Sequence, residues 1–345
     1  MTTTRNQGDD IRHEEEEWLK PPASSLGLHQ VYPNPNTRSN PDIDVVFVHG
    51  LGGDSISTWT KDKSLWIRAL LPKSPLYQNA RILSYGYDAR AFVRPFAHSV
   101  NGRVFTFAEA LLGDLRDKRV TAAARARPLI LMGHSLGGIV IKSALLQASA
   151  REALYGDLLR ATKAIVFFGT PHQGAGTAEW ASFLGGLGQA VGLRSTEVVG
   201  ELKRWSHTLV EQTTLFADLW ERFDITTFYE TMKTNGVMIV PDGAARVGQR
   251  NEQARRLVAD HIQVCKFSEN DANWTTVRGR LDAIVEGIME AEAIQMHVVL
   301  PDAPLQEPAR AQLRGSEADE WEARVTKLKQ TNESRGSQSG NGRSG

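Results

Sequence analysis

Residues 129–141 read LILMGHSLGGIVI, and this stretch decides the fold. Its apolar start, residues 129–132, shows no period-two alternation, which is typical of a strand buried on both faces of a parallel sheet. The apolar residues that follow, between 139 and 147, fit a helix that packs one side against that sheet. The stretch therefore predicts a strand, a tight turn and a helix, with Ser135 at the turn.

The pattern G-x-S-x-G surrounds this serine. Gly133 and Gly137 suit a sharp strand-to-helix turn and a close approach between the two elements. In that geometry the hydroxyl of Ser135 is expected at the carboxyl edge of the sheet, exposed, with the helix N-terminus behind it to favour developing negative charge. The pattern predicts a nucleophilic serine; a chance match in an ordinary loop is the alternative.

Further apolar runs of strand length alternate with helix-like runs along the chain. The runs that predict buried strands are 44–48, 81–85, 129–132, 164–168 and 225–229. Apolar residues at helical spacing occur in 107–115 and again in 274–288. This alternation predicts an α/β fold, a mostly parallel sheet covered by helices on both faces.

Composition divides the chain into three parts. Residues 1–41 combine an acidic run with several prolines and few periodic apolar positions, which predicts a flexible, extended arm. Residues 42–295 carry the alternating pattern and predict the α/β domain, with 175–219 as a candidate cap insertion. Residues 296–345 are polar, so we expect a largely disordered tail.

Charge and cysteine content narrow the classes of function. The chain has 40 basic and 40 acidic residues, so its balanced charge gives no reason to expect nucleic acid. The single cysteine, Cys265, excludes an internal disulfide and is predicted to be a core residue. No secretory signal is evident at the N-terminus, and no apolar run reaches the ~20 residues that a membrane-spanning helix needs.

The first predicted strand ends in VFVHGLGGD, residues 46–54. Successive glycines let the backbone approach a bound carbonyl, so the amides of Leu51 and Leu136 are predicted to form an oxyanion hole. A phosphate-binding Walker loop would need Gly-Lys-Ser/Thr, whereas an aspartate follows the glycines here. His49 precedes the serine by a long way and is expected to be structural.

Four histidines follow Ser135, and their positions select one as the general base. His172 follows the very next strand, His207 lies in a polar stretch, and His297 comes after the last core helix. His261 stands in ADHIQVCKF, before that helix, where a catalytic histidine loop is expected. A surface or capping histidine is the alternative interpretation of His261.

Two carboxylates compete for the acid of a Ser, acid, His order. Glu230 ends the run ITTFYE at the carboxyl end of a predicted strand, whereas Asp242 follows a shorter apolar run. Glu230 is favoured and Asp242 stays open. Asp260 adjoins His261 in sequence, and a loop or helix-end aspartate is the simpler interpretation.

Phe183 and Leu187 recur at helical spacing in the glycine-rich run AEWASFLGGLGQAVGL, residues 178–193. A core helix is the simpler interpretation. The alternative is a mobile apolar cap over Ser135, because glycines weaken a helix by up to ~1 kcal/mol each. Such a cap would suit acyl chains, which makes these two side chains candidate substrate contacts.

Five motifs in order, VFVHGLGGD, GHSLGG, FFGTPHQG, FYET and DHIQVCKF, resemble the lipase-like serine esterase family of α/β-hydrolases. Within it, the likeness is to the "serine active site containing" proteins and their fungal relatives. The resemblance covers residues 42–295 and carries over Ser135, His261 and Glu230. It implies ester or lipid substrates, phospholipid remodelling or intracellular signalling, a place in the mitochondrion or endoplasmic reticulum, and peripheral membrane contact.

The predicted chemistry is acyl transfer. Ser135 is the nucleophile, His261 the general base, and Glu230 orients and stabilises the imidazolium, with no cofactor or metal required. An acyltransferase with the same three residues is one alternative. An inactive interaction module in a signalling complex is another, although such a module has no need of an intact triad. Protein partners are not predicted.

Overall fold

The computed structural model describes residues 24–37, 39–89, 100–172, 183, 185–188 and 214–299. The chain divides into two compact units, residues 1–279 and 280–345, each of which is described by itself. The cap insertion predicted at 175–219 and the tail predicted at 296–345 lie mostly outside the described residues.

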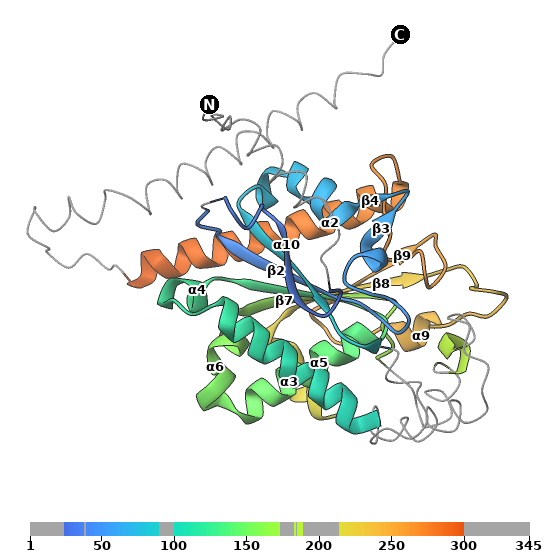
Figure 1. Cartoon of the computed structure of the whole chain (residues 1–345), viewed down its shortest axis with the longest axis horizontal. Coiled ribbons are helices and arrows are strands. Elements are labelled where there is room, and N and C mark those ends of the chain that lie inside the picture. Colours follow the sequence, from blue (N-terminus) through green and yellow to red (C-terminus); the bar gives the residue numbers. More distant parts are fainter. Residues whose placement is uncertain are drawn as a thin grey trace, which may run out of the picture. The chain divides into compact units, whose positions relative to one another are not determined.

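In the part of the chain that the structure describes, seven strands of the first unit form one sheet (Figure 1). They are β1 (Gly27–Tyr32), β2 (Ile43–Val48), β5 (Ala80–Gly86), β6 (Leu129–His134), β7 (Thr162–Phe168), β8 (Asp224–Glu230) and β9 (Glu252–Leu257). Their order across the sheet is β1-β5-β2-β6-β7-β8-β9, and only β1 runs antiparallel to its neighbour. All the parallel strands therefore end at the same edge.

The central strands are buried on both faces. Every residue of β2 and of β6 is buried, and the two strands pair in parallel with Val46 opposite Leu131. Such strands need apolar side chains on both sides, which explains the absence of alternation in their sequences. All five strands predicted from apolar runs are confirmed.

Two edge strands were not predicted. β1 falls inside residues 1–41, so the flexible arm predicted there is wrong for residues 27–32. Only Leu28 and Val31 of β1 are buried, and β9 buries only Leu257. An edge strand is held largely by backbone hydrogen bonds on one side, so its sequence need not carry an apolar run.

The described residues also form α-helices. They are α2 (Trp66–Ala69), α3 (Val100–Lys118), α4 (Ala122–Ala126), α5 (Leu136–Ala150), α6 (Glu152–Ala161), α9 (Asp242–Ala245) and α10 (Ala272–Val299), and most of α10 belongs to the second unit. Short 3-10 helices occupy Ser57–Trp59, Leu71–Lys73, Pro75–Tyr77 and Phe216–Arg222, and a small hairpin pairs β3 (Thr60–Lys61) with β4 (Ser64–Leu65). Helices α3, α5 and α6 lie together on one face, and α2 lies on the other (Figure 1).

The helical spacing predicted in 107–115 and from 274 onward is confirmed by α3 and α10. Helix α10 runs to Val299 and so includes residues 296–299, at the start of the tail predicted to be largely disordered. None of the described helices has the length and apolar character that crossing a bilayer requires.

Aromatic side chains fill the core on the α2 side of the sheet. Phe47 of β2 contacts Trp59 and Trp66 edge-on, with ring centroids 5.0 and 5.5 Å apart. The indole N–H of Trp66 donates to the carbonyl oxygen of Cys265 at 2.9 Å. Cys265 is fully buried, which confirms it as a core residue.

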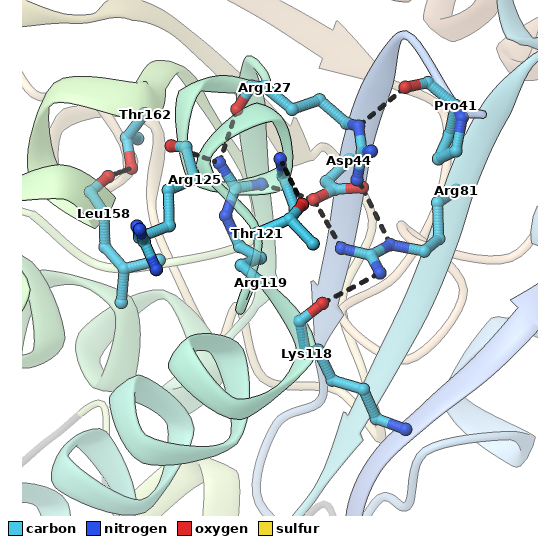
Figure 2. A network of polar contacts seen from close by, with 11 residues as sticks. Pro41, Asp44, Arg81, Lys118, Arg119, Thr121, Arg125, Arg127, Leu158 and Thr162 are labelled. Carbon is cyan, nitrogen blue, oxygen red and sulfur yellow. Dashed lines mark hydrogen bonds and ion pairs between the residues drawn. The ribbon is translucent and has the colours of Figure 1, made fainter.

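A buried ion cluster fixes the opposite, amino edge of the sheet. Asp44 of β2 is fully buried and accepts two hydrogen bonds from Arg81, at 2.9 and 2.7 Å, while Arg119 and Arg127 also donate to its carboxylate (Figure 2). Arg119 is fully buried as well, and it donates to the carbonyl of Arg127. One carboxylate thus joins β2 and β5 to the segments that follow α3 and α4.

Asp44→Asn is expected to lower the free energy of unfolding by about 3–5 kcal/mol, because it leaves buried guanidinium groups without their counter-charge. Urea denaturation measures the loss. Arg160→Ala is the control, since the ion pair of Arg160 with Glu152 is solvent-exposed and its removal should change stability little. Equal effects of the two substitutions would contradict a special role for Asp44.

Candidate active site

Ser135 alone forms the turn between β6 and α5. Its backbone has φ 53° and ψ −120°, a conformation that a residue with a side chain rarely adopts. The surrounding structure holds it there: the N–H of Ser135 donates to Phe168 at 2.8 Å, and its carbonyl accepts from the Gly138 N–H and the Thr170 hydroxyl, both at 3.1 Å. Tertiary contacts therefore fix the strained turn.

Gly137 shows why the turn needs a glycine after the serine. A Cβ at this position would lie 2.1 Å from the carbonyl oxygen of Val48 and 2.5 Å from that of His49. The N-terminus of α5 therefore packs directly against the carboxyl end of β2, as the G-x-S-x-G pattern predicts.

The hydroxyl of Ser135 contacts an imidazole ring. His261 lies in the loop after β9, and its Nε2 is 2.9 Å from Ser135 Oγ. His261 is 1% exposed and Ser135 is fully buried. The prediction of an exposed serine hydroxyl is therefore wrong, because the backbone at Gly50 and the ring of His261 pack against this serine.

The acid that contacts His261 is Glu230, the last residue of β8. Its Oε1 lies 3.1 Å from His261 Nδ1 and accepts the backbone N–H of Val240 at 2.7 Å. A carboxylate only accepts hydrogen bonds, so Nδ1 carries the proton in the neutral ring and the lone pair of Nε2 faces Ser135. In this tautomer, Nε2 of His261 can accept the proton of the Ser135 hydroxyl.

Asp242 lies elsewhere. It begins α9, its side chain is 57% exposed, and it forms an ion pair with Arg246 at 2.6 Å. The hydrogen bonds from Arg246 hold the pKa of this carboxyl below its usual value. Asp260 accepts the N–H groups of Ile262 and Gln263, as a loop aspartate does. Of the three carboxylates, the structure brings only Glu230 to His261.

The two predicted oxyanion donors come from different segments of the chain, one after β2 and one directly after Ser135. A Cβ at Gly50 would approach Ser135 Cβ to 2.8 Å, so the segment carrying Leu51 runs directly beside the nucleophile. Leu136 is the first residue of α5, where a backbone N–H has no intrahelical acceptor. These positions support Leu51 and Leu136 as donors, which stays a prediction.

His49 is a structural residue, as expected. It is fully buried and stacks on Tyr87, with ring centroids 4.3 Å apart. Its Nε2 accepts the Tyr87 N–H at 3.2 Å, so Nδ1 carries the proton and donates to the Gly50 carbonyl at 2.9 Å. Burial lowers the pKa of His49, which favours the neutral ring that these two hydrogen bonds require.

Phe183 and Leu187 are both buried and belong to the main hydrophobic core, which fits the simpler interpretation of their spacing. The ring of Phe183 also lies edge-on to His261, with centroids 6.3 Å apart. Of the predicted cap at 175–219, only 183, 185–188 and 214–219 are described; the rest of it lies outside the described residues, and so does His207.

Two features were missed from the sequence. One is His134, whose Nε2 lies 2.9 Å from the carbonyl oxygen of His261. The pattern G-x-S-x-G leaves its second position free, so nothing local marks this histidine. The other is Lys142 of α5, which is fully buried on a mostly apolar helix. A lysine among apolar residues is the only signal that could have drawn attention to it.

Lys142 has no carboxylate partner among the described residues. Its amine contacts the carbonyl of Pro171 at 3.5 Å, and burial lowers its pKa to about 7. His172 is equally buried, neither ring nitrogen has a hydrogen-bond partner within the described part, and burial lowers its pKa well below the usual value. Within those residues no three His, Cys, Asp or Glu side chains are arranged to hold a metal.

Sequence comparison defines the class. The profile of the Alpha/beta hydrolase family matches residues 45–323, and the chain therefore belongs to the alpha/beta hydrolase family. Together with the sheet described above, this confirms the predicted fold.

The individual proteins that this chain is similar to share a low sequence identity with it. The chain is similar to Protein SERAC1 of Danio rerio, at 28% identity over 277 residues, and of Bos taurus, at 29% over 281 residues. Each alignment covers 71% of this chain and 39% of the relative, so the chain spans well under half the length of these proteins. Fungal relatives stay a prediction.

Among solved structures, the Bacillus licheniformis lipase BlEst2 in mature form is 18% identical, with 73% of this chain and 97% of that chain covered and a TM-score of 0.48. The peroxisomal alpha-beta-hydrolase Lpx1 of Saccharomyces cerevisiae is 12% identical, with 83% and 87% covered and a TM-score of 0.41.

Lys142→Met is expected to raise stability most at low pH. The amine titrates near 10.5 in the unfolded chain and at about 7 in the folded one, so between these values the unfolded state binds more protons and wild-type stability rises with pH. Below about pH 7 the amine is protonated in both states, so the wild type bears the full free-energy cost of burying its charge. Denaturation at about pH 6 and about pH 9 should show this slope in the wild type and its loss in the variant.

Lys233→Met, which changes an exposed lysine, provides the control for Lys142→Met and should keep the wild-type slope. An unchanged slope in Lys142→Met would show that Lys142 is not the group that titrates.

Proposed function

We propose that the protein is a serine hydrolase of carboxylic esters that works through an acyl-enzyme on Ser135. The observation that carries the proposal is the unbroken hydrogen-bond chain from Ser135 Oγ to His261 Nε2, at 2.9 Å, and from His261 Nδ1 to Glu230 Oε1, at 3.1 Å. All three residues are buried and occur in the order serine, acid, histidine. Membership of the alpha/beta hydrolase family supports hydrolase activity.

In the first half-reaction, Ser135 Oγ attacks the ester carbonyl carbon while its proton passes to His261 Nε2. The carbonyl electrons move to oxygen, and the resulting oxyanion accepts hydrogen bonds from the N–H groups of Leu51 and Leu136. The intermediate collapses by breaking the bond to the leaving alcohol, which takes the proton from His261. Glu230 holds the ring and stabilises its positive charge.

In the second half-reaction, water attacks the acyl-enzyme and gives its proton to His261. Collapse of the second tetrahedral intermediate returns that proton to Ser135 Oγ and releases the carboxylic acid. A second alcohol in place of water would yield a new ester by the same steps, so the same residues serve an acyltransferase.

Burial favours this chemistry. Ser135, Glu230 and His261 are each at most 2% exposed, and charge–dipole interactions in such surroundings are stronger than in water. An inactive interaction module would need neither the strained backbone of Ser135 nor the hydrogen bonds that hold Glu230. The structure therefore favours turnover over a purely binding role.

For the substrate, we propose lipid-like esters whose acyl part contacts Phe183 and Leu187. The ring of Phe183 lies edge-on to that of His261, with centroids 6.3 Å apart, and Phe183 and Leu187 both belong to the main core cluster. The resemblance to lipase-like serine esterases extends this proposal to phospholipid remodelling or signalling at mitochondrial or endoplasmic reticulum membranes.

Ser135→Ala should lower the hydrolysis of nitrophenyl esters by as much as ~10⁶-fold, because residues of a triad act as a unit. Initial rates over a range of ester concentrations measure the loss. Ser143→Ala, a substitution at another buried serine of α5, should keep wild-type turnover. Hydrolysis that survives in Ser135→Ala would remove this residue from the mechanism.

Glu230→Gln should lower kcat by up to ~10⁴-fold, since an amide can present the wrong partner to His261 Nδ1. Asp242→Asn is the matched control and should change kcat little, because that carboxylate pairs with Arg246 on the surface. Circular dichroism checks that both variants fold. The reverse ranking of kcat at equal stability would assign the acid to Asp242.

Phe183→Ala should raise KM for long-chain nitrophenyl esters more than for the acetate, because only a long acyl chain would reach this ring. Steady-state kinetics over a series of chain lengths tests this, with the melting temperature as a check on folding. An equal change for short and long esters would make Phe183 a core residue only.

A further inference from the structure

We propose that His134 is a positioning residue for the reaction: its side chain holds the peptide backbone of His261 so that the imidazole reaches Ser135. The inference rests on the proposed function. His134 ends β6 and directly precedes Ser135, so the serine and the group that fixes its base are neighbours in the chain.

The contact is specific in its chemistry. Nε2 of His134 lies 2.9 Å from the carbonyl oxygen of His261, and the two rings are 5.1 Å apart. A carbonyl oxygen only accepts, so Nε2 carries the proton and the ring of His134 is a donor at this atom. Burial, with the neighbouring His261 ring adding to its effect, lowers the pKa of His134 to about 3. The ring is therefore neutral near physiological pH.

A second side chain holds the other end of the same residue. The backbone N–H of His261 donates to the hydroxyl oxygen of Thr234 at 3.0 Å. Thr234 is buried, and its backbone is fixed by two hydrogen bonds with Val237, at 2.8 and 3.0 Å. The N–H and the C=O of His261 are thus both bonded to side chains, one from the loop after β8 and one from β6.

The loop around His261 is packed on one side only, because Ala259 and Val264 are buried whereas Val258 and Ile262 are 73% and 37% exposed. The two contacts to the backbone of His261 add to this packing and to the hydrogen bond with Glu230. A small shift of this backbone would lengthen the 2.9 Å distance from His261 Nε2 to Ser135 Oγ. Misplacement of a reacting group by about 1 Å can cost on the order of 10²-fold in rate.

Two substitutions separate the hydrogen bond from the volume of the ring. His134→Gln keeps an N–H donor at about the place of Nε2, whereas His134→Phe keeps a ring without a donor. We expect His134→Phe to lower kcat on the order of 10²-fold with little change in KM, and His134→Gln to restore most of the rate. The rate at which a fluorophosphonate labels Ser135 should fall and recover in parallel.

A spectroscopic reading distinguishes positioning from a merely structural role. The proton between His261 Nδ1 and Glu230 should give a low-field proton NMR signal in the wild type and in His134→Gln, and this signal should broaden or vanish in His134→Phe. A structural role would lower the melting temperature but leave the signal and the labelling rate of the folded protein unchanged.

If His134→Phe fails to fold, Thr234→Val tests the same claim from the other side, with Thr234→Ser as the conservative variant. It should show the same loss of kcat and of the low-field signal. Wild-type labelling in His134→Phe, or in Thr234→Val where the former does not fold, would overturn the inference alone. A wild-type protein that neither labels at Ser135 nor hydrolyses esters would overturn the proposed function instead.

Discussion

The site depends on one strained residue between two buried elements. Ser135 takes a positive φ of 53° so that the chain can leave a fully buried strand and enter a buried helix without an intervening loop. This conformation is costly, on the order of 1–3 kcal/mol, and persists because Phe168 and Thr170 on the neighbouring strand end bond to the serine backbone. The absence of a side chain at Gly137 lets the helix approach closely enough for this to happen.

The parallel sheet supplies the remaining groups. Because the parallel strands end at one edge, the segment after β2, the turn after β6, the end of β8 and the loop after β9 meet there, although they are far apart in sequence. The opposite edge carries the buried cluster around Asp44, which fixes the start of β2 (Figure 2). The candidate active site and the buried ion cluster thus lie at opposite ends of the same strands.

Much of this arrangement follows from the sequence. Apolar runs predict the buried strands, and the spacing of glycines around Ser135 predicts the turn. The strand-end position of Glu230 favours it over Asp242 but does not exclude Asp242. The rest of the choice depends on long-range contacts, because the Val240 N–H bonds to Glu230 and the Arg246 guanidinium pairs with Asp242. The edge strands β1 and β9 and the burial of the serine escaped prediction because they rest on long-range pairing, which leaves little local pattern.

We propose that this turn presents Ser135 to a carbonyl carbon for covalent attack. The most direct measurement is mass spectrometry of the protein quenched in acid during turnover of a slowly hydrolysed ester, followed by peptide mapping. We expect an added acyl group on the peptide that contains residues 129–141, at Ser135, and expect it to disappear as the substrate is consumed. Ester consumption with no adduct, or with an adduct at another residue, would contradict this proposal.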